Sequence, residues 1–211
     1  SDDSERDADL RLRQMQRYIA PRDVGIHAAP LVVFDFETTG LDYESDVIIE
    51  VGALKVVGGN VVDQYETFVA TDVPLTEEII KLTGITPEML EGQPPIAQVI
   101  PEFLKFIDKS LLVAHNADFD YTMLKQACNR LGIDLSWPCF CTLKMARELL
   151  PDLENKKLDT LAEHYGLSFE ARHRSIGDVK VTTDVLKEML AERTDLQVWE
   201  DFEPFSVNFA S

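Results

Sequence analysis

Basic residues are scarce in this chain of 211 residues, where 20 lysines and arginines stand against 38 aspartates and glutamates for a formal net charge of −18. This balance argues against a protein that coats duplex phosphates with a broad basic face. It does not exclude local contact with nucleic acid, because divalent cations held by carboxylates can supply positive charge beside a phosphate. Composition alone therefore leaves the function class open.

Long apolar runs and cysteines are also few. No apolar run approaches the roughly 18 residues that span a bilayer, and the first residues are charged rather than signal-like. We therefore expect no membrane contact and a cytoplasmic location. The three cysteines, Cys128, Cys139 and Cys141, lack the spacing of a zinc knuckle and are expected to be reduced structural thiols.

The chain is short enough for one compact domain with additions at both ends. We divide it into an N-terminal helical extension and linker at 1–29, a central domain at 30–194 and an acidic, aromatic C-terminal tail at 195–211. The extension is predicted to be helical from the spacing of Leu10, Leu12, Met15 and Ile19.

The C-terminal tail has two interpretations. Its aromatic residues either fold back on the core of the protein or dock on a partner, such as a polymerase or a second copy of the chain. Pro204 argues against a continuous helix in this segment. The aromatic residues are Trp199, Phe202, Phe205 and Phe209.

Hydrophobic patterning predicts the elements of the central domain. Short apolar or β-branched runs predict strands, and Gly58-Gly59-Asn60 predicts a tight turn between the second and the third. Strands first and alternating helices afterwards predict an α/β fold with a mixed sheet flanked by helices. The predicted strands are 31–36, 47–57, 60–69 and 111–114, and the predicted helices are 76–82, 95–107, 119–131, 142–150, 158–165 and 177–193.

Three acidic motifs lie where these elements end. Asp35 and Glu37 are two apart on a strand, so their carboxylates share one face. The motif His115 to Asp120 follows a strand and opens a helix, at the edge where open α/β sheets bind ligands. In the third motif, His173 is expected on a loop and Asp178 in the first turn of the last helix.

Each motif alone has an ordinary explanation: a solvated strand end, a helix cap, or an exposed imidazole near a helical acid. Together they offer four carboxylates and one histidine. That set suffices for phosphodiester hydrolysis with two divalent ions, in which an ion acidifies the attacking water and an imidazole accepts its proton.

The three motifs resemble those of the DEDDh group of DnaQ-like 3′→5′ exonucleases, which includes the proofreading epsilon subunit of bacterial DNA polymerase III. The segments 82–90, 142–147 and 158–162 are similar to family segments as well, and the resemblance covers about residues 30–192. It implies a ribonuclease-H-like fold with a mixed five-stranded sheet. The spacing of four residues between His173 and Asp178 is typical of the histidine subgroup rather than the tyrosine subgroup.

The resemblance also implies roles for the acidic residues around two Mg²⁺ or Mn²⁺ ions. Asp35 would bridge both ions, Glu37 and Asp178 would hold the ion on the nucleophile side, Asp120 would support the other, and His173 would be the general base. One departure concerns the third motif, where Ile176 and Val179 replace small residues of the family. How the loop packs beside His173 is therefore left open.

Six further residues are candidates for substrate contact. Thr38, Thr39 and Leu41 would grip the terminal nucleotide, unless they only form a turn. His115, Asn116 and Phe119 would contact the substrate or shape the site, and Phe119 has an alternative role in the core.

The predicted reaction removes nucleoside 5′-monophosphates from the 3′ end of a single-stranded nucleic acid, with DNA favoured over RNA, in proofreading or repair. One alternative is an exoribonuclease that trims RNA 3′ ends. The other is a catalytically weak module that binds 3′ ends or protein partners.

Overall fold

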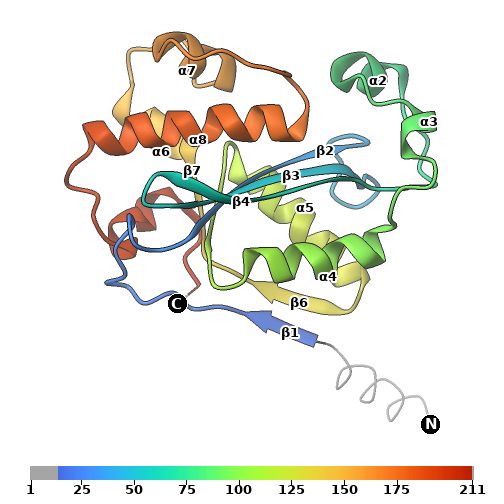
Figure 1. The fold of residues 1–211 in the computed structure, drawn as a ribbon, viewed down its shortest axis with the longest axis horizontal. Helices are drawn as coiled ribbons and strands as arrows, with labels where there is room; N and C mark the ends of the chain where they lie inside the picture. The colour runs from blue at the N-terminus through green and yellow to red at the C-terminus, as the bar shows by residue number, and fades with distance from the viewer. Residues whose placement is uncertain (1–13, 211) are drawn as a thin grey trace.

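A six-stranded mixed sheet forms the centre of the computed structural model, which describes residues 14–210 (Figure 1). The strand order is β4-β3-β2-β5-β7-β8. Strands β2, β3 and β4 form an antiparallel meander, β5 and β7 run parallel to β2, and β8 is antiparallel to β7. The strands are β2 (Leu31–Thr38), β3 (Ile48–Val57), β4 (Asn60–Phe68), β5 (Leu111–Ala114), β7 (Cys139–Cys141) and β8 (Ser206–Asn208).

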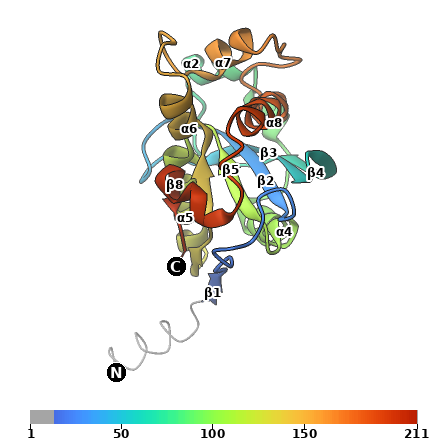
Figure 2. The same ribbon diagram turned by 90° about the vertical axis from the view of Figure 1, so that its left-hand side faces the viewer.

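Helices cover both faces of this sheet (Figures 1 and 2). One face packs against α4 (Ile96–Ile107) and α5 (Ala117–Arg130). The other face packs against α6 (Thr142–Leu149), α7 (Leu158–His164) and α8 (Ser175–Glu192). Two short helices, α2 (Glu77–Thr83) and α3 (Pro87–Leu90), lie between β4 and α4 in the chain.

Strand β2 shows how side-chain alternation positions the acidic residues. Leu31 and Val33 belong to the hydrophobic cluster on the side of α8, whereas Val32 and Phe34 belong to the cluster on the side of α4 and α5. Because alternate residues of a strand face the same way, Asp35 lies on the α8 side where this strand approaches its end. The sheet thus directs a carboxylate toward the N-terminus of α8.

The predicted α/β architecture is confirmed, including the hairpin between β3 and β4. Gly58 and Gly59 have φ angles of 58° and 80°, a left-handed conformation that glycine adopts without steric cost. Strand β2 also pairs directly with β5, in parallel. The sheet has six strands rather than five, because the end of the chain pairs with the otherwise free edge of β7.

The predicted N-terminal helix is wrong where the structure describes it. Gln14–Arg17 form β1, which pairs in parallel with β6 (Ile133–Ser136). The edge of β6 offers backbone partners that outweigh a weak helical pattern, and an ion pair of 2.8 Å between Arg17 and Asp134 adds a cross-strand contact. The rest of the predicted helix, including Leu10 and Leu12, lies outside the described residues.

The C-terminal segment folds back on the core of the protein. Trp199, Phe202 and Phe205 are buried in the cluster on the α8 side, and Phe209 stacks on Trp199 with ring centroids 4.9 Å apart. A short 3-10 helix, η1 (Trp199–Phe205), precedes β8 instead of a continuous α-helix. The first of the two interpretations of these aromatic residues therefore describes the structure.

Two smaller expectations concern cysteines and membranes. All three cysteines are free and buried, as predicted for structural thiols. Among residues 14–210, no helix combines the length and the apolar character needed to cross a bilayer.

Candidate active site

The structure brings three of the predicted acids together. Asp35 and Glu37 on β2 and Asp178 on α8 each offer a carboxylate oxygen, and these oxygens all lie within 4.8 Å of one another. Asp178 occupies the first turn of α8, the helix that packs across the face of β2 to which Asp35 points. Residues 143 positions apart in the chain thus meet at one point.

Asp120 lies beside this group of three. It is 3% exposed, and its Oδ1 accepts a hydrogen bond of 3.1 Å from the backbone N–H of Phe36. Phe36 is the residue between Asp35 and Glu37, so this bond holds the N-terminus of α5 against the acidic end of β2. The fourth acid of the predicted set is therefore next to the other three, although its oxygens are outside the 4.8 Å group.

The acids face each other with little compensation. Burial raises the pKa of Asp35 well above its usual value, and the charges of Asp120, Glu37 and Asp178 raise it further. Burial, followed by Asp178 and Glu50, raises the pKa of Glu37 to about 8, and burial raises the pKa of Asp120 to about 8. Oδ2 of Asp35 is buried and has no hydrogen-bond partner. An all-oxygen cluster of this kind fits hard divalent cations such as Mg²⁺ and Mn²⁺.

Asp178 also contacts two neighbours from the preceding loop. Its Oδ2 forms an ion pair of 2.7 Å with Nη1 of Arg172, and its Oδ1 accepts a bond of 3.2 Å from the backbone N–H of His173. Burial nevertheless raises the pKa of Asp178, with Arg172 opposing the shift. His173 has a φ of 61°, in the left-handed region, and its backbone N–H is the group that contacts Asp178.

One further buried carboxylate, which was not predicted from the sequence, anchors this loop. Glu50 on β3 is 2% exposed and accepts hydrogen bonds of 2.7 Å from Nη2 of Arg174 and 2.7 Å from the backbone N–H of Ser175. Arg174 directly follows His173, so Glu50 holds both the loop and the first residue of α8. A single acid within the buried apolar run of β3 was the available signal.

Two glycines allow close packing at the start of α8, one against the sheet and one against the preceding loop. A Cβ added at Gly52 would lie 2.6 Å from the backbone N of Ile176, and one added at Gly177 would collide with the carbonyl of Ala171. The large residues at the third motif point elsewhere, since Val179 is buried in the core and Ile176 packs against it. The loop before α8 and the helix therefore touch at Gly177. The larger residues Ile176 and Val179 do not disturb this contact.

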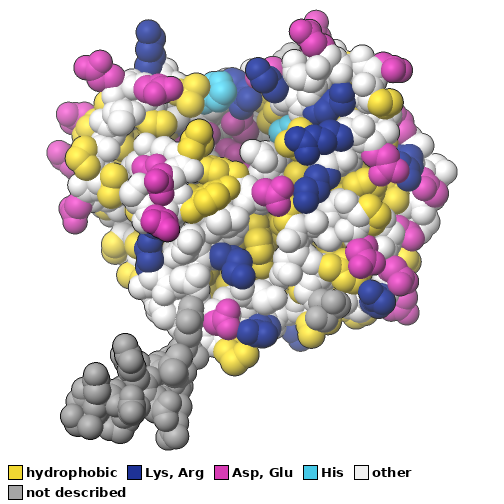
Figure 3. All heavy atoms as spheres, turned by 180° about the vertical axis from the view of Figure 1, so that it is seen from behind, with side chains coloured by type: hydrophobic (Ala, Val, Ile, Leu, Met, Phe, Trp, Pro, Cys, Tyr) yellow, Lys and Arg dark blue, Asp and Glu magenta, His cyan; other side chains and the backbone are white. Residues whose placement is uncertain are grey.

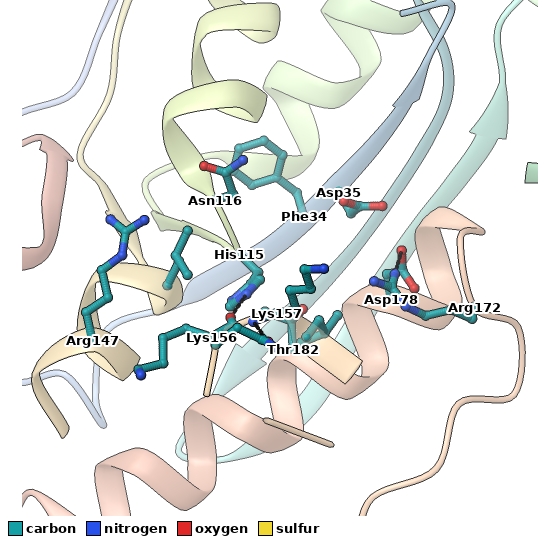
Figure 4. Close-up of a pocket in the computed structure, with 13 residues that line it drawn as sticks. Phe34, Asp35, His115, Asn116, Arg147, Lys156, Lys157, Arg172, Asp178 and Thr182 are labelled. Atoms are coloured by element: carbon teal, nitrogen blue, oxygen red, sulfur yellow. Dashed lines mark hydrogen bonds and ion pairs between the residues drawn. The ribbon is translucent and has the colours of Figure 1, made fainter. Parts of the chain in front are cut away.

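A pocket of about 610 Å³ adjoins the acids (Figure 4). His115 lies in this pocket with both ring nitrogens engaged: Nε2 donates to the carbonyl of Lys156 at 2.8 Å, and Nδ1 accepts from the hydroxyl of Thr142 at 2.9 Å. Burial lowers the pKa of His115 to about 4, so the ring is neutral. His115 thus ties the loop before α7 to the end of β5 and shapes the site.

The other predicted substrate contacts fall into two groups. In the first group the side chains are available to a ligand. Asn116 is exposed, has a φ of 63° and lines the pocket. Leu41 is 82% exposed, and the ring of Phe119 packs beside that of Tyr43 with centroids 5.9 Å apart. By contrast, Thr38 and Thr39 use their hydroxyls inside the turn. They donate to the carbonyl of Gly40 at 2.7 Å and to Asp46 at 2.8 Å. Their side chains build the loop that presents Leu41.

The mixed sheet and its flanking helices form a ribonuclease-H-like fold, with an acidic pocket at the end of the central strand. A family model described as Exonuclease matches residues 32–186, a range that includes all three acidic motifs. The chain belongs to this exonuclease family, which confirms the resemblance to DnaQ-like exonucleases. Members of the family are hydrolytic nucleases that depend on divalent metals.

The relatives in sequence are much longer proteins. The DNA polymerase III PolC-type of Clostridium perfringens is 45% identical over 156 residues, which are 74% of this chain and 11% of that protein. The PolC-type polymerase of Thermotoga maritima is 44% identical over 158 residues, or 74% of this chain and 12% of that protein. The PolC-type polymerase of Bacillus subtilis is 40% identical over 166 residues, which are 78% of this chain and 12% of that protein. The chain thus spans about an eighth of these relatives.

Solved structures show the same fold at lower identity. Exonuclease X in complex with 5′ overhanging duplex DNA matches with a TM-score of 0.67 and 24% identity, over 81% of this chain and 99% of that one. E. coli exonuclease I in complex with a dT13 oligonucleotide matches with a TM-score of 0.72 and 18% identity, over 80% and 42% of the two chains.

The raised pKa values predict how pH and metal affect stability. Glu37 and Asp120 hold protons in the folded state up to about pH 8, whereas the unfolded chain releases them near pH 4 to 5. The folded state then binds more protons, so these groups make the metal-free protein less stable as pH rises from about 5 to about 8. Excess Mn²⁺ should raise the melting temperature more at about pH 8 than at about pH 6, since protons compete for the same oxygens.

Calorimetry in EDTA and in MnCl₂ across this range would measure both effects. The double variant Glu37→Gln/Asp120→Asn serves as the control, because amides do not titrate, and its melting temperature should depend less on pH and on Mn²⁺. An unchanged dependence in this variant would show that other groups cause it.

Proposed function

We propose that this chain is a 3′→5′ exonuclease that removes nucleotides one at a time from a single-stranded DNA end, with two divalent ions held by its acids. The observation that carries the proposal is that the carboxylates of Asp35, Glu37 and Asp178 converge. Oδ2 of Asp35 is buried there without a hydrogen-bond partner, and Asp120 lies beside the three acids. Membership of the exonuclease family supports this reading.

The acids and His173 would divide the chemistry between them. Asp35, Glu37, Asp120 and Asp178 would hold Mg²⁺ or Mn²⁺, which when bound stabilises the attacking and leaving oxygens and acidifies the attacking water. His173 would accept the proton of that water as the general base. The bond that breaks joins the terminal phosphorus to the 3′ oxygen of the preceding nucleotide, so a nucleoside 5′-monophosphate is released.

The loop after β2 would receive the terminal nucleotide. Leu41 is exposed beside the acids' strand, and the rings of Tyr43 and Phe119 offer apolar surface on which a base can stack. Asn116 offers an amide toward the pocket. A single-stranded or frayed end fits this arrangement because a paired end must first be melted.

Two of the named neighbours favour DNA as the substrate. The exonuclease I and exonuclease X structures are described as complexes with a dT13 oligonucleotide and with overhanging duplex DNA. The PolC-type relatives are polymerases, so the chain would proofread newly made DNA as part of, or beside, a polymerase. Trimming of RNA 3′ ends is the competing function.

A labelled oligonucleotide tests the proposal. With a 5′ label on single-stranded DNA and Mg²⁺ or Mn²⁺ present, we expect a ladder of shortening products. A 3′ label should instead appear at once as mononucleotide, and EDTA should stop both reactions. Products of random internal length, cleavage that persists in EDTA, or faster digestion of a matched RNA would each overturn the proposed function.

A further inference from the structure

The wall of the pocket opposite the acids is basic, which is unusual in a chain of net charge −18. Figure 3 shows Lys and Arg side chains gathered along one side of an acidic hollow, with hydrophobic side chains along the other. Four cations line the same pocket as Asp35 and Asp178. They are Arg147 on α6, Lys156 and Lys157 in the loop before α7, and Arg172.

Two of these cations are already committed to protein partners. Arg172 pairs with Asp159 at 2.7 Å as well as with Asp178, and Nζ of Lys156 donates to the carbonyl of Leu153 at 2.6 Å. Arg147 and Lys157 are exposed, and within residues 14–210 their side chains form no ion pair or hydrogen bond. Ion-paired lysines such as Lys144, which pairs with Asp118, and Lys180, which pairs with Glu170, do not line the pocket.

We propose that Arg147 and Lys157, here called the basic wall, bind consecutive backbone phosphates of the single strand that enters the active site. In Figure 4 Arg147 lies at the end of the pocket away from the acids, and Lys157 lies between His115 and Asp178. The two cations therefore follow the line along which a strand would leave the acids. The inference rests on the proposed function and extends its substrate site beyond the terminal nucleotide.

Charge and shape support a phosphodiester backbone as the ligand. The four acids repel an approaching polyanion, so unpaired cations in the same pocket provide the local attraction that the whole chain lacks. The opposite side of the hollow carries hydrophobic side chains in Figure 3, and bases can stack on such a surface. A strand would thus place its phosphates on the basic wall and its bases toward these side chains.

Binding measurements without cleavage test the basic wall. In an Asp35→Asn background, fluorescence anisotropy with a thymidine oligonucleotide of about ten nucleotides gives Kd as a function of NaCl. We expect Arg147→Ala/Lys157→Ala to weaken binding at least about tenfold at about 50 mM NaCl and to reduce the slope of log K against log[NaCl] by about 1.4, since each phosphate contact on a single strand contributes about 0.7. A uridine oligonucleotide of the same length should show the same loss.

Two matched variants separate local contact from general charge. Lys109→Ala removes an exposed lysine before β5, at the opposite end of that strand from His115, and should leave Kd and slope unchanged. Arg147→Lys/Lys157→Arg keeps both charges and should retain most of the affinity. Unchanged binding in the double alanine variant, or an equal loss in Lys109→Ala, would overturn the inference. The measurement needs no hydrolysis, so a chain without nuclease activity can still show the basic wall, and an active chain can still lack it.

Discussion

Asp35→Asn is expected to reduce metal-dependent cleavage of single-stranded DNA by about 10³-fold or more, because it removes the ligand proposed to bridge both ions. The loss of metal-ion stabilisation, several kcal/mol, corresponds to this factor at about 1.4 kcal/mol for each tenfold change in rate. The amide is nearly isosteric with the carboxylate, so the fold should persist. Initial rates on a 5′-labelled oligonucleotide with saturating Mg²⁺ would measure the loss.

The same variant should make the metal-free protein more stable to heat. Asp35 carries a buried oxygen without a partner and a pKa that burial and three neighbouring acids raise. Replacing it with a neutral amide removes that repulsion, and each 1 kcal/mol gained should raise the melting temperature by about 2–4 °C in a chain of this size. Asp63→Asn, at an exposed position on β4, is the matched control and should change neither property. A normal cleavage rate in Asp35→Asn would rule out the assigned site.

His173→Gln is expected to lower kcat by about 10² to 10⁴-fold, the usual contribution of a general base. The affinity for Mn²⁺ should remain close to that of the unchanged protein, because no carboxylate is removed and the backbone N–H that contacts Asp178 is retained. Single-turnover rates together with a Mn²⁺ titration would separate the two effects.

His164→Gln provides the comparison for this histidine. His164 is exposed at the end of α7 and lies edge-to-face against Tyr165 with ring centroids 4.7 Å apart, and it is not among the residues that line the pocket beside the acids. Its replacement should leave kcat unchanged. If His173→Gln behaves in the same way, the base is another group.

Much of the fold and of the acidic site follows from local patterns. The run from Leu31 to Phe34 is apolar on both faces, which is typical of a central strand, and Asp35 and Glu37 after it are two apart, which places them on one face. Asp120 and Asp178 begin helices after a strand or a loop, where they can reach the end of β2. These features depend on neighbouring residues, and sequence alone reveals them.

Contacts between distant residues could not be predicted in the same way. Gln14–Arg17 form a strand because the edge of β6, more than a hundred residues away, offers backbone partners. The pairing of Glu50 with Arg174 and the neutral state of His115 likewise arise from tertiary packing, in which a buried group acquires its partners and its pKa. The basic wall has no motif, since Arg147 and Lys157 meet only when α6 and the loop before α7 pack beside β5.

Diffraction from crystals soaked in MnCl₂, recorded with the anomalous signal of manganese, tests the central claim most directly. The account predicts an anomalous peak among the carboxylates of Asp35, Glu37 and Asp178, with a second peak toward Asp120 when a mononucleotide is bound. Manganese bound elsewhere on the protein, with none between these acids, would contradict it.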